Sequence, residues 1–130
     1  MVVQVESKES KKEKKIAVII TQPPYQSIAG KEGLDLALVA ATFEQSVSLF
    51  FIGDGVWQLV KDQQPELINQ KNISASFGAL ELYGIEDIYT DVSALKNYNL
   101  IEQDLVITTQ VMALDKLGTV IASHDIIINF

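Results

Sequence analysis

The chain has 130 residues, a net charge of −7, a single histidine and no cysteine. This length is sufficient for one domain with a buried core. The lack of cysteine excludes disulfides, thiolate catalysis and cysteine-ligated metals, and it favours a cytoplasmic location. No run of about 18 apolar residues is present, and the charged N-terminus lacks the apolar segment of a signal peptide, so we expect neither a membrane span nor export.

The charged residues are unevenly distributed along the chain. All ten basic residues are lysines, and five of them lie in the first 15 residues. From Ile16 onward, five lysines stand against fourteen acidic residues. A nucleic-acid-binding face is normally basic and rich in arginine, so direct contact with nucleic acid is not expected. We interpret residues 1–14 as a flexible, lysine-rich tail, with a weak electrostatic docking arm as the alternative, and residues 15–130 as a single domain.

The first half of the domain begins with a buried strand and a helix. The continuous apolar run at residues 16–20 is typical of a strand that is buried on both faces. A helix is predicted over residues 31–45. Its central part, residues 34–41, is apolar nearly all the way round. Such a helix is buried on more than one side. One side can lie on a sheet, and the other is a candidate contact with another subunit.

A second buried strand is predicted at residues 47–52. The Gly-Asp-Gly turn at residues 53–55 follows it, and Asp54 is expected to cap the backbone N–H groups of the next turn. Residues 56–60 predict a short helical turn, and the polar residues 61–70 predict a loop.

The second half predicts three further strands and three helices. A helix capped by Asn72 or Ser74 should carry Phe77, Leu80, Leu82 and Tyr83 and end at Gly84. The expected strands are residues 85–90, which are less apolar and therefore placed near an edge, then 105–109 and 125–130. The expected helices are residues 91–96, capped by Asp91, and the weaker segment 112–122. Strands that alternate with helices predict a three-layer α/β/α fold with a mostly parallel five-stranded sheet.

The residues that carry chemistry do not assemble into a recognisable active site. Asp54 follows a strand as a phospho-acceptor would, but an acidic pair is absent at Thr21–Gln22 and a lysine is absent at Asn129–Phe130. The single histidine, His124, is expected to be structural, because no nucleophile motif accompanies it. Glu81, Glu86 and Asp87 are expected to form a solvated surface. We expect no catalytic residue, no metal and no cofactor.

Three segments carry a resemblance to a known family. They are Thr-Gln-Pro-Pro-Tyr at 21–25, Ala-Gly-Lys-Glu-Gly-Leu-Asp at 29–35, and Phe-Phe-Ile-Gly-Asp-Gly-Val-Trp-Gln-Leu at 50–59. Taken together they resemble the DsrE/DsrF-like family, and the similarity extends over residues 16–130. The resemblance implies a DsrE/F-like fold for the domain.

The resemblance also implies a function. It suggests a subunit of a TusBCD-like heterohexameric sulfurtransferase complex, with TusB-like and TusD-like subunits as partners. Such complexes relay persulfide sulfur from TusA-like to TusE-like carriers for synthesis of 2-thiouridine at the tRNA wobble position. The reactive cysteine of the TusD-like subunit would fall near Thr90, whose hydroxyl cannot carry a persulfide. The expected role is therefore structural and non-catalytic, with Tyr25, Val56 and Trp57 as candidate interface residues.

Two other functions remain open from the sequence. One is a DsrF-like subunit of a DsrEFH complex in sulfur oxidation. The other is a stand-alone module that binds a small ligand in the loops after the first two strands. Homo-oligomerisation of the isolated chain is a further expectation.

Overall fold

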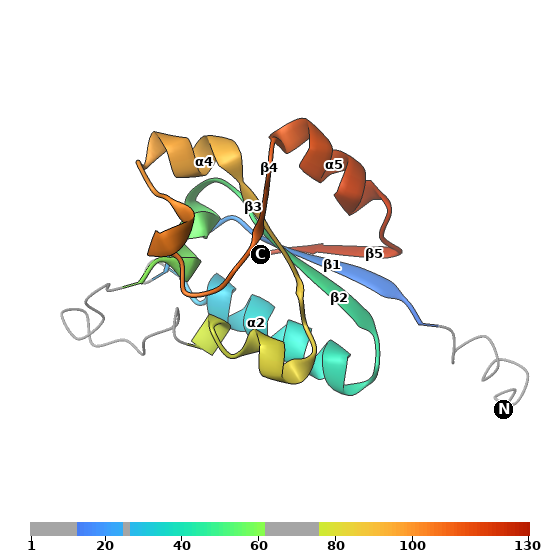
Figure 1. Ribbon diagram of the computed structural model, residues 1–130. Helices are drawn as coiled ribbons and strands as arrows, with labels where there is room; N and C mark the ends of the chain where they lie inside the picture. The colour runs from blue at the N-terminus through green and yellow to red at the C-terminus, as the bar shows by residue number, and fades with distance from the viewer. Residues whose placement is uncertain (1–12, 25–26, 62–75) are drawn as a thin grey trace, which may run out of the picture.

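The computed structural model describes residues 13–24, 27–61 and 76–130 (Figure 1). The expectations for the tail up to residue 12, for Tyr25, for the loop 62–70 and for the cap at Asn72 or Ser74 lie outside the described residues.

A five-stranded sheet forms the centre of the domain. Its strands are β1 (Lys15–Ile20), β2 (Ser46–Phe51), β3 (Asp87–Asp91), β4 (Gln110–Met112) and β5 (Ile126–Asn129). The spatial order is β4-β3-β2-β1-β5, and every neighbouring pair is parallel. The predicted α/β fold with a parallel five-stranded sheet is therefore confirmed.

Helices cover both faces of this sheet. The helical elements are α2 (Ala29–Thr42), η1 (Gly53–Leu59), η3 (Leu80–Tyr83), α4 (Val92–Asn97), η4 (Glu102–Asp104) and α5 (Leu114–Ala122). Figure 1 shows α2 on one side of the sheet and α5 on the other, with α4 beside the ends of the strands. These are the three layers that the alternating pattern predicts.

The alternation of side chains along the strands divides the core between the two faces. Ile16, Val18 and Ile20 point to the larger cluster under α2, whereas Ala17 points to a smaller cluster under α5. Because partners in a parallel register share a face, Leu49 and Phe51 of β2 join the first cluster and Phe50 joins the second. Stacking of Phe50 on Tyr89, with ring centroids 4.7 Å apart, extends the smaller cluster to β3.

The outer side of α2 keeps apolar side chains exposed in the single chain. Leu34, Ala37 and Ala40 are buried against the sheet, whereas Val39 is 54% exposed and Phe43 is 71% exposed. The predicted end of this helix at residue 45 is wrong. The helix ends at Thr42 because the chain must turn into β2, and Glu44 adopts a left-handed φ of 62°.

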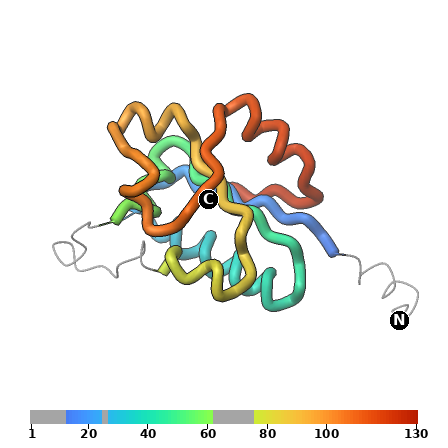
Figure 2. Tube along the Cα trace, viewed as in Figure 1, coloured from blue at the N-terminus to red at the C-terminus, as the bar shows by residue number. Residues whose placement is uncertain are grey.

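The predicted fourth strand at residues 105–109 is also wrong. Leu105 forms only an isolated antiparallel bridge with Val60, and the Val106 N–H donates to Leu59 O. The apolar run is thus a loop that packs beside the chain following η1, as the Cα trace shows (Figure 2). Pairing with β3 begins only at Gln110.

This shift moves the following helix as well. Met112 belongs to β4 and Ala113 is extended, so α5 begins at Leu114 instead of residue 112. The third strand starts at Asp87 instead of residue 85, after Gly84 turns the chain with a left-handed φ of 79°. It is second from the edge of the sheet, near the edge as predicted.

Candidate functional site at the carboxyl edge of the sheet

The carboxyl ends of β1, β2 and β3 meet at one edge of the sheet, where open α/β sheets bind their ligands. In this chain η1 follows β2 at that edge, and α4 follows β3 directly. The residues that the sequence singles out, namely Asp54, Val56, Trp57, Thr90 and Asp91, all lie here.

The Gly-Asp-Gly turn exists because η1 lies directly on the end of β1. A Cβ at Gly55 would be 1.9 Å from the carbonyl oxygen of Ile20, a distance that no side chain can occupy. Gly53 has a left-handed φ of 58°, which glycine adopts without strain. The two glycines therefore serve close packing and the turn, and they fix where Asp54 and Trp57 project.

The buried Asp91 carboxylate connects this turn to α4. One oxygen accepts a hydrogen bond of 2.9 Å from the Ser93 N–H, which confirms the predicted helix cap. The other accepts from the Gly53 N–H at 3.2 Å. The turn after β2 is thus capped by Asp91, and the prediction that Asp54 performs this role is wrong.

Asp54 instead makes a long-range contact with Tyr98, the residue that ends α4. The Tyr98 hydroxyl donates a hydrogen bond to Asp54 Oδ1, and the Trp57 and Tyr98 rings pack edge to face with centroids 5.2 Å apart. The hydrogen bond to Asp54 raises the pKa of Tyr98 above its ordinary value; burial and the charge of Asp54 add to this, and a hydrogen bond with the Trp57 side chain opposes it. We call Asp54, Trp57 and Tyr98 the Asp54 cluster.

Thr90 lies inside the core and does not face solvent. It is 0% exposed, and its hydroxyl shares a hydrogen bond of 2.9 Å with the hydroxyl of Thr109. A residue in this environment is a packing element that links β3 to the segment before β4. Its side chain is therefore closed to solvent in the single chain.

The other interface candidates differ in what they present to solvent. Trp57 is half-buried and contributes to the carboxyl edge, whereas Val56 is fully buried in the core. Next to them, the buried Gln58 donates from Nε2 to the Gln22 carbonyl at 3.0 Å and ties η1 to the loop after β1. Its amide occupies the space that a side chain at Gly30 would need.

His124 lies at the opposite end of the strands and has a structural role, as expected. Its Nδ1 is 2.9 Å from the Val120 carbonyl, and because a carbonyl only accepts, Nδ1 carries the proton. Its Nε2 is 2.9 Å from the Ser48 hydroxyl, which forms the second hydrogen bond of the ring. Both nitrogens are therefore used in attaching the end of α5 to β2. Glu81, Glu86 and Asp87 are exposed, as predicted.

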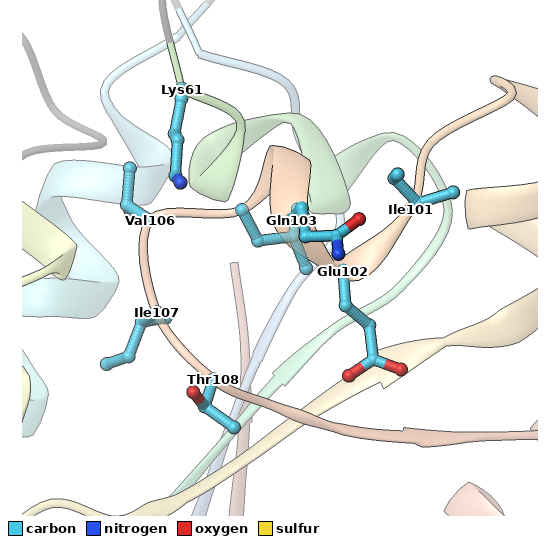
Figure 3. Close-up of a pocket in the computed structure, with 8 residues that line it drawn as sticks. Lys61, Ile101, Glu102, Gln103, Val106, Ile107 and Thr108 are labelled. Atoms are coloured by element: carbon cyan, nitrogen blue, oxygen red, sulfur yellow. The ribbon is translucent and has the colours of Figure 1, made fainter.

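Two hollows of the surface flank the loop before β4. One, of about 680 Å³, is lined by residues of segment 101–108 and by Lys61. Figure 3 shows its Lys61 amine and Glu102 carboxylate on separate sides, so they form no acid–base pair. A second hollow, of about 500 Å³, lies behind the same loop against Glu81 and Glu86. Apart from Lys61, neither is lined by the described loops after β1 and β2.

The described residues contain neither a metal-ligand cluster nor a membrane-spanning helix. Within ranges 13–24, 27–61 and 76–130, no three histidine or acidic side chains converge as metal ligands. No helix in the same ranges has the length and apolar character needed to cross a membrane. At the carboxyl edge, the Asp54 and Asp91 carboxylates lie near the Trp57 and Tyr98 rings.

Comparison with known proteins gives consistent matches over the whole domain. Residues 14–130 match the DsrE/DsrF-like family. Two curated proteins named Protein TusC, from Buchnera aphidicola subspecies Baizongia pistaciae and Acyrthosiphon pisum, are each 36% identical over 118 residues, which covers 90% of this chain and 99% of theirs. The crystal structure of the ychN protein from E. coli superimposes with a TM-score of 0.77 at 20% identity, covering 90% of this chain and 99% of that one. This last similarity shows the fold alone.

Proposed function

The chain belongs to the DsrE/DsrF-like family, and from this premise we propose that it is a non-catalytic structural subunit of a TusBCD-like heterohexameric sulfurtransferase complex. Its partners in this proposal are TusB-like and TusD-like subunits. The complex would pass persulfide sulfur from a TusA-like to a TusE-like carrier in the cytoplasm, for 2-thiouridine synthesis at the tRNA wobble position.

One observation carries the non-catalytic part of the proposal. Persulfide relay requires a thiol of lowered pKa, and the chain contains no cysteine at all. Thr90, the residue near the position of the partner's cysteine, is buried and bonded to Thr109. Sulfur must therefore be held by another subunit while this chain supports it.

The exposed apolar residues support the assembly part of the proposal. Val39 and Phe43 on α2 would be covered by a sister subunit, and Trp57 at the carboxyl edge is a residue type that interfaces favour. An obligate interface of about 1,000 Å² per side would contribute tens of kcal/mol, at about 25 cal/mol per Å², before association costs. We therefore expect the chain to bury these apolar residues in an assembly.

The other two functions receive less support. The relatives carry the name TusC, which favours the tRNA pathway over a DsrF-like role in sulfur oxidation. A stand-alone binding module would need a pocket in the loops after β1 and β2, and the two hollows described above lie elsewhere, with Lys61 as their only contact with the described part of those loops.

Co-expression tests the proposal directly. The tagged chain is produced together with TusB-like and TusD-like chains, and the purified material is sized and analysed by native mass spectrometry. We expect a mixed hexamer with two copies of each chain. If the tagged chain elutes without either sister, the structural-subunit proposal is wrong.

A further inference from the structure

We propose that the Asp54 cluster is the docking point for an arginine side chain of a sister subunit. This inference rests on the proposed heteromeric assembly and adds to it a specific surface and a specific partner chemistry. It rests on the geometry of three side chains, on the unbalanced negative charge around them, and on the composition of the chain.

The three side chains form a hydrogen-bonded series of fixed direction. An indole N–H can only donate, so the Tyr98 hydroxyl accepts from Trp57 and donates its own proton to Asp54 Oδ1. The edge-to-face contact, at an angle of 61°, holds the two rings against each other. Asp54 is exposed, and the hydrogen bond from Tyr98 to Oδ1 orients its carboxylate, which leaves Oδ2 as the acceptor for a partner.

The negative charge at this point has no cation to balance it in the described part of the chain. Among described residues the ion pair is Lys31 with Asp35, on α2. Asp91, 3% exposed, lies behind the same turn, and the hydrogen bonds described for its carboxylate come from the backbone N–H groups of Gly53 and Ser93. Two carboxylates thus flank Gly53, and a cationic group on a partner would complement them.

The side chains of the cluster indicate an arginine, and the composition of the chain indicates that another subunit supplies it. A guanidinium group can donate to a carboxylate while its flat face lies on an aromatic ring, a combination that an ammonium group does not match. Asp54 and the aromatic pair offer both contacts side by side. All ten basic residues of the chain are lysines, so a second copy cannot supply the arginine. The cluster therefore favours a different subunit over self-association.

Two substitutions with matched controls test the surface. Asp54→Asn keeps an oxygen that can accept from Tyr98 but removes the charge. Its control, Asp115→Asn, removes an exposed charge from α5, on the face of the sheet opposite α2. Tyr98→Phe removes the hydroxyl that orients Asp54, and Tyr83→Phe changes an exposed tyrosine on η3 as its control. Binding of the full chain to immobilised TusB-like and TusD-like subunits is measured at several salt concentrations.

We expect Asp54→Asn to weaken binding roughly tenfold or more and to reduce its salt dependence, because a desolvated charge pair is lost. Tyr98→Phe should weaken binding less, and both controls should bind like the wild type. Fluorescence of Trp57, the single tryptophan, and thermal unfolding verify that each variant is folded.

An arginine-specific reagent tests the partner chemistry. Phenylglyoxal has no arginine to modify in this chain, so it can be applied to the sister subunits before mixing. The treatment should weaken binding of the wild type roughly tenfold but leave the already weakened Asp54→Asn binding unchanged.

Three results would overturn the inference while the proposed function stands, and a fourth would refute both. Equal binding of Asp54→Asn and Asp115→Asn would remove the cluster from the interface while the assembly stands. Insensitivity to phenylglyoxal, or loss of self-association in Asp54→Asn, would identify the cation as a lysine. No binding of the wild type to either sister would refute the proposed function, and the inference with it.

Discussion

Thr90→Cys places a thiol at the buried position that the family resemblance puts near the reactive cysteine of the proposed TusD-like partner, and we expect this thiol to be unreactive. The side chain at this position is 0% exposed. Loss of the hydroxyl also removes a good partner from Thr109, at a cost of about 1–2 kcal/mol. A reagent can reach the thiol only when β3 opens, and core strands open at close to the global free energy of unfolding. With a stability of about 5 kcal/mol, labelling should be slower than that of a free thiol by about three orders of magnitude.

All labelling in this assay comes from the introduced residue, because the chain has no other cysteine. Thr90→Cys and Thr108→Cys, an exposed threonine four positions before Met112, are labelled with a chromogenic disulfide reagent at pH 8, with and without urea. Both should react rapidly in urea, and only Thr108→Cys should react rapidly in the native state. If the two thiols react within tenfold of each other in native buffer, then Thr90 is accessible and its exclusion from relay chemistry is unfounded.

Three further outcomes are expected. Gly55→Ala should destabilise the chain by about 3 kcal/mol or more in urea unfolding, because its Cβ would lie 1.9 Å from a backbone oxygen. The control Gly118→Ala, in α5, should instead stabilise the chain by about 1 kcal/mol, because no atom lies within 4 Å of the added Cβ. Equal effects of the two substitutions would contradict the close packing of η1 on the end of β1. Because folding raises the pKa of Tyr98, the stabilisation from its hydrogen bond is fully present below the ordinary pKa of 10.0 and is lost as the pH rises through the folded-state pKa. In an ultraviolet titration, the difference between the wild type and Tyr98→Phe should therefore appear above pH 10.0. The same transition should shift to lower pH in Asp54→Ala. Trp57→Ala should weaken assembly or stability by roughly 2–5 kcal/mol in unfolding and sizing experiments, and wild-type behaviour would show that the side chain is neither core nor contact.

Local pattern predicted most of the fold. The apolar runs predict β1, β2 and β5 within two residues of their ends. For β1 and β2 the reason holds, because a strand buried on both faces needs a continuous apolar run. The edge strand β5 has such a run although Ile126 and Ile127 are exposed in the single chain. The same rule gives a wrong fourth strand, because residues 105–107 are equally apolar but form a partly buried loop. Whether such a segment forms a strand or a loop depends on whether it pairs with β3. This long-range contact cannot be predicted from the pattern of apolar residues.

The candidate site illustrates the same limit. Asp91 was recognised as a cap because its partner Ser93 is two residues away. The partners of Asp54 were missed because Tyr98 is 44 residues away in sequence. Trp57 was selected for its residue type alone, and its contact with Tyr98 could not be foreseen. A tyrosine just after a short helix, facing an aspartate just after a strand, is a signal only once the strand order is known.

Reconstituted sulfur transfer tests the central claim that this chain supports a relay without holding sulfur. Persulfide passage from a loaded TusA-like carrier to a TusE-like acceptor is followed with the isolated chain, with the assembled complex, and with a complex that contains Thr90→Ala. We expect no transfer by the isolated chain, and equal rates for the wild-type and Thr90→Ala complexes. Transfer by the isolated chain, or loss of transfer in an intact Thr90→Ala complex, would contradict the account.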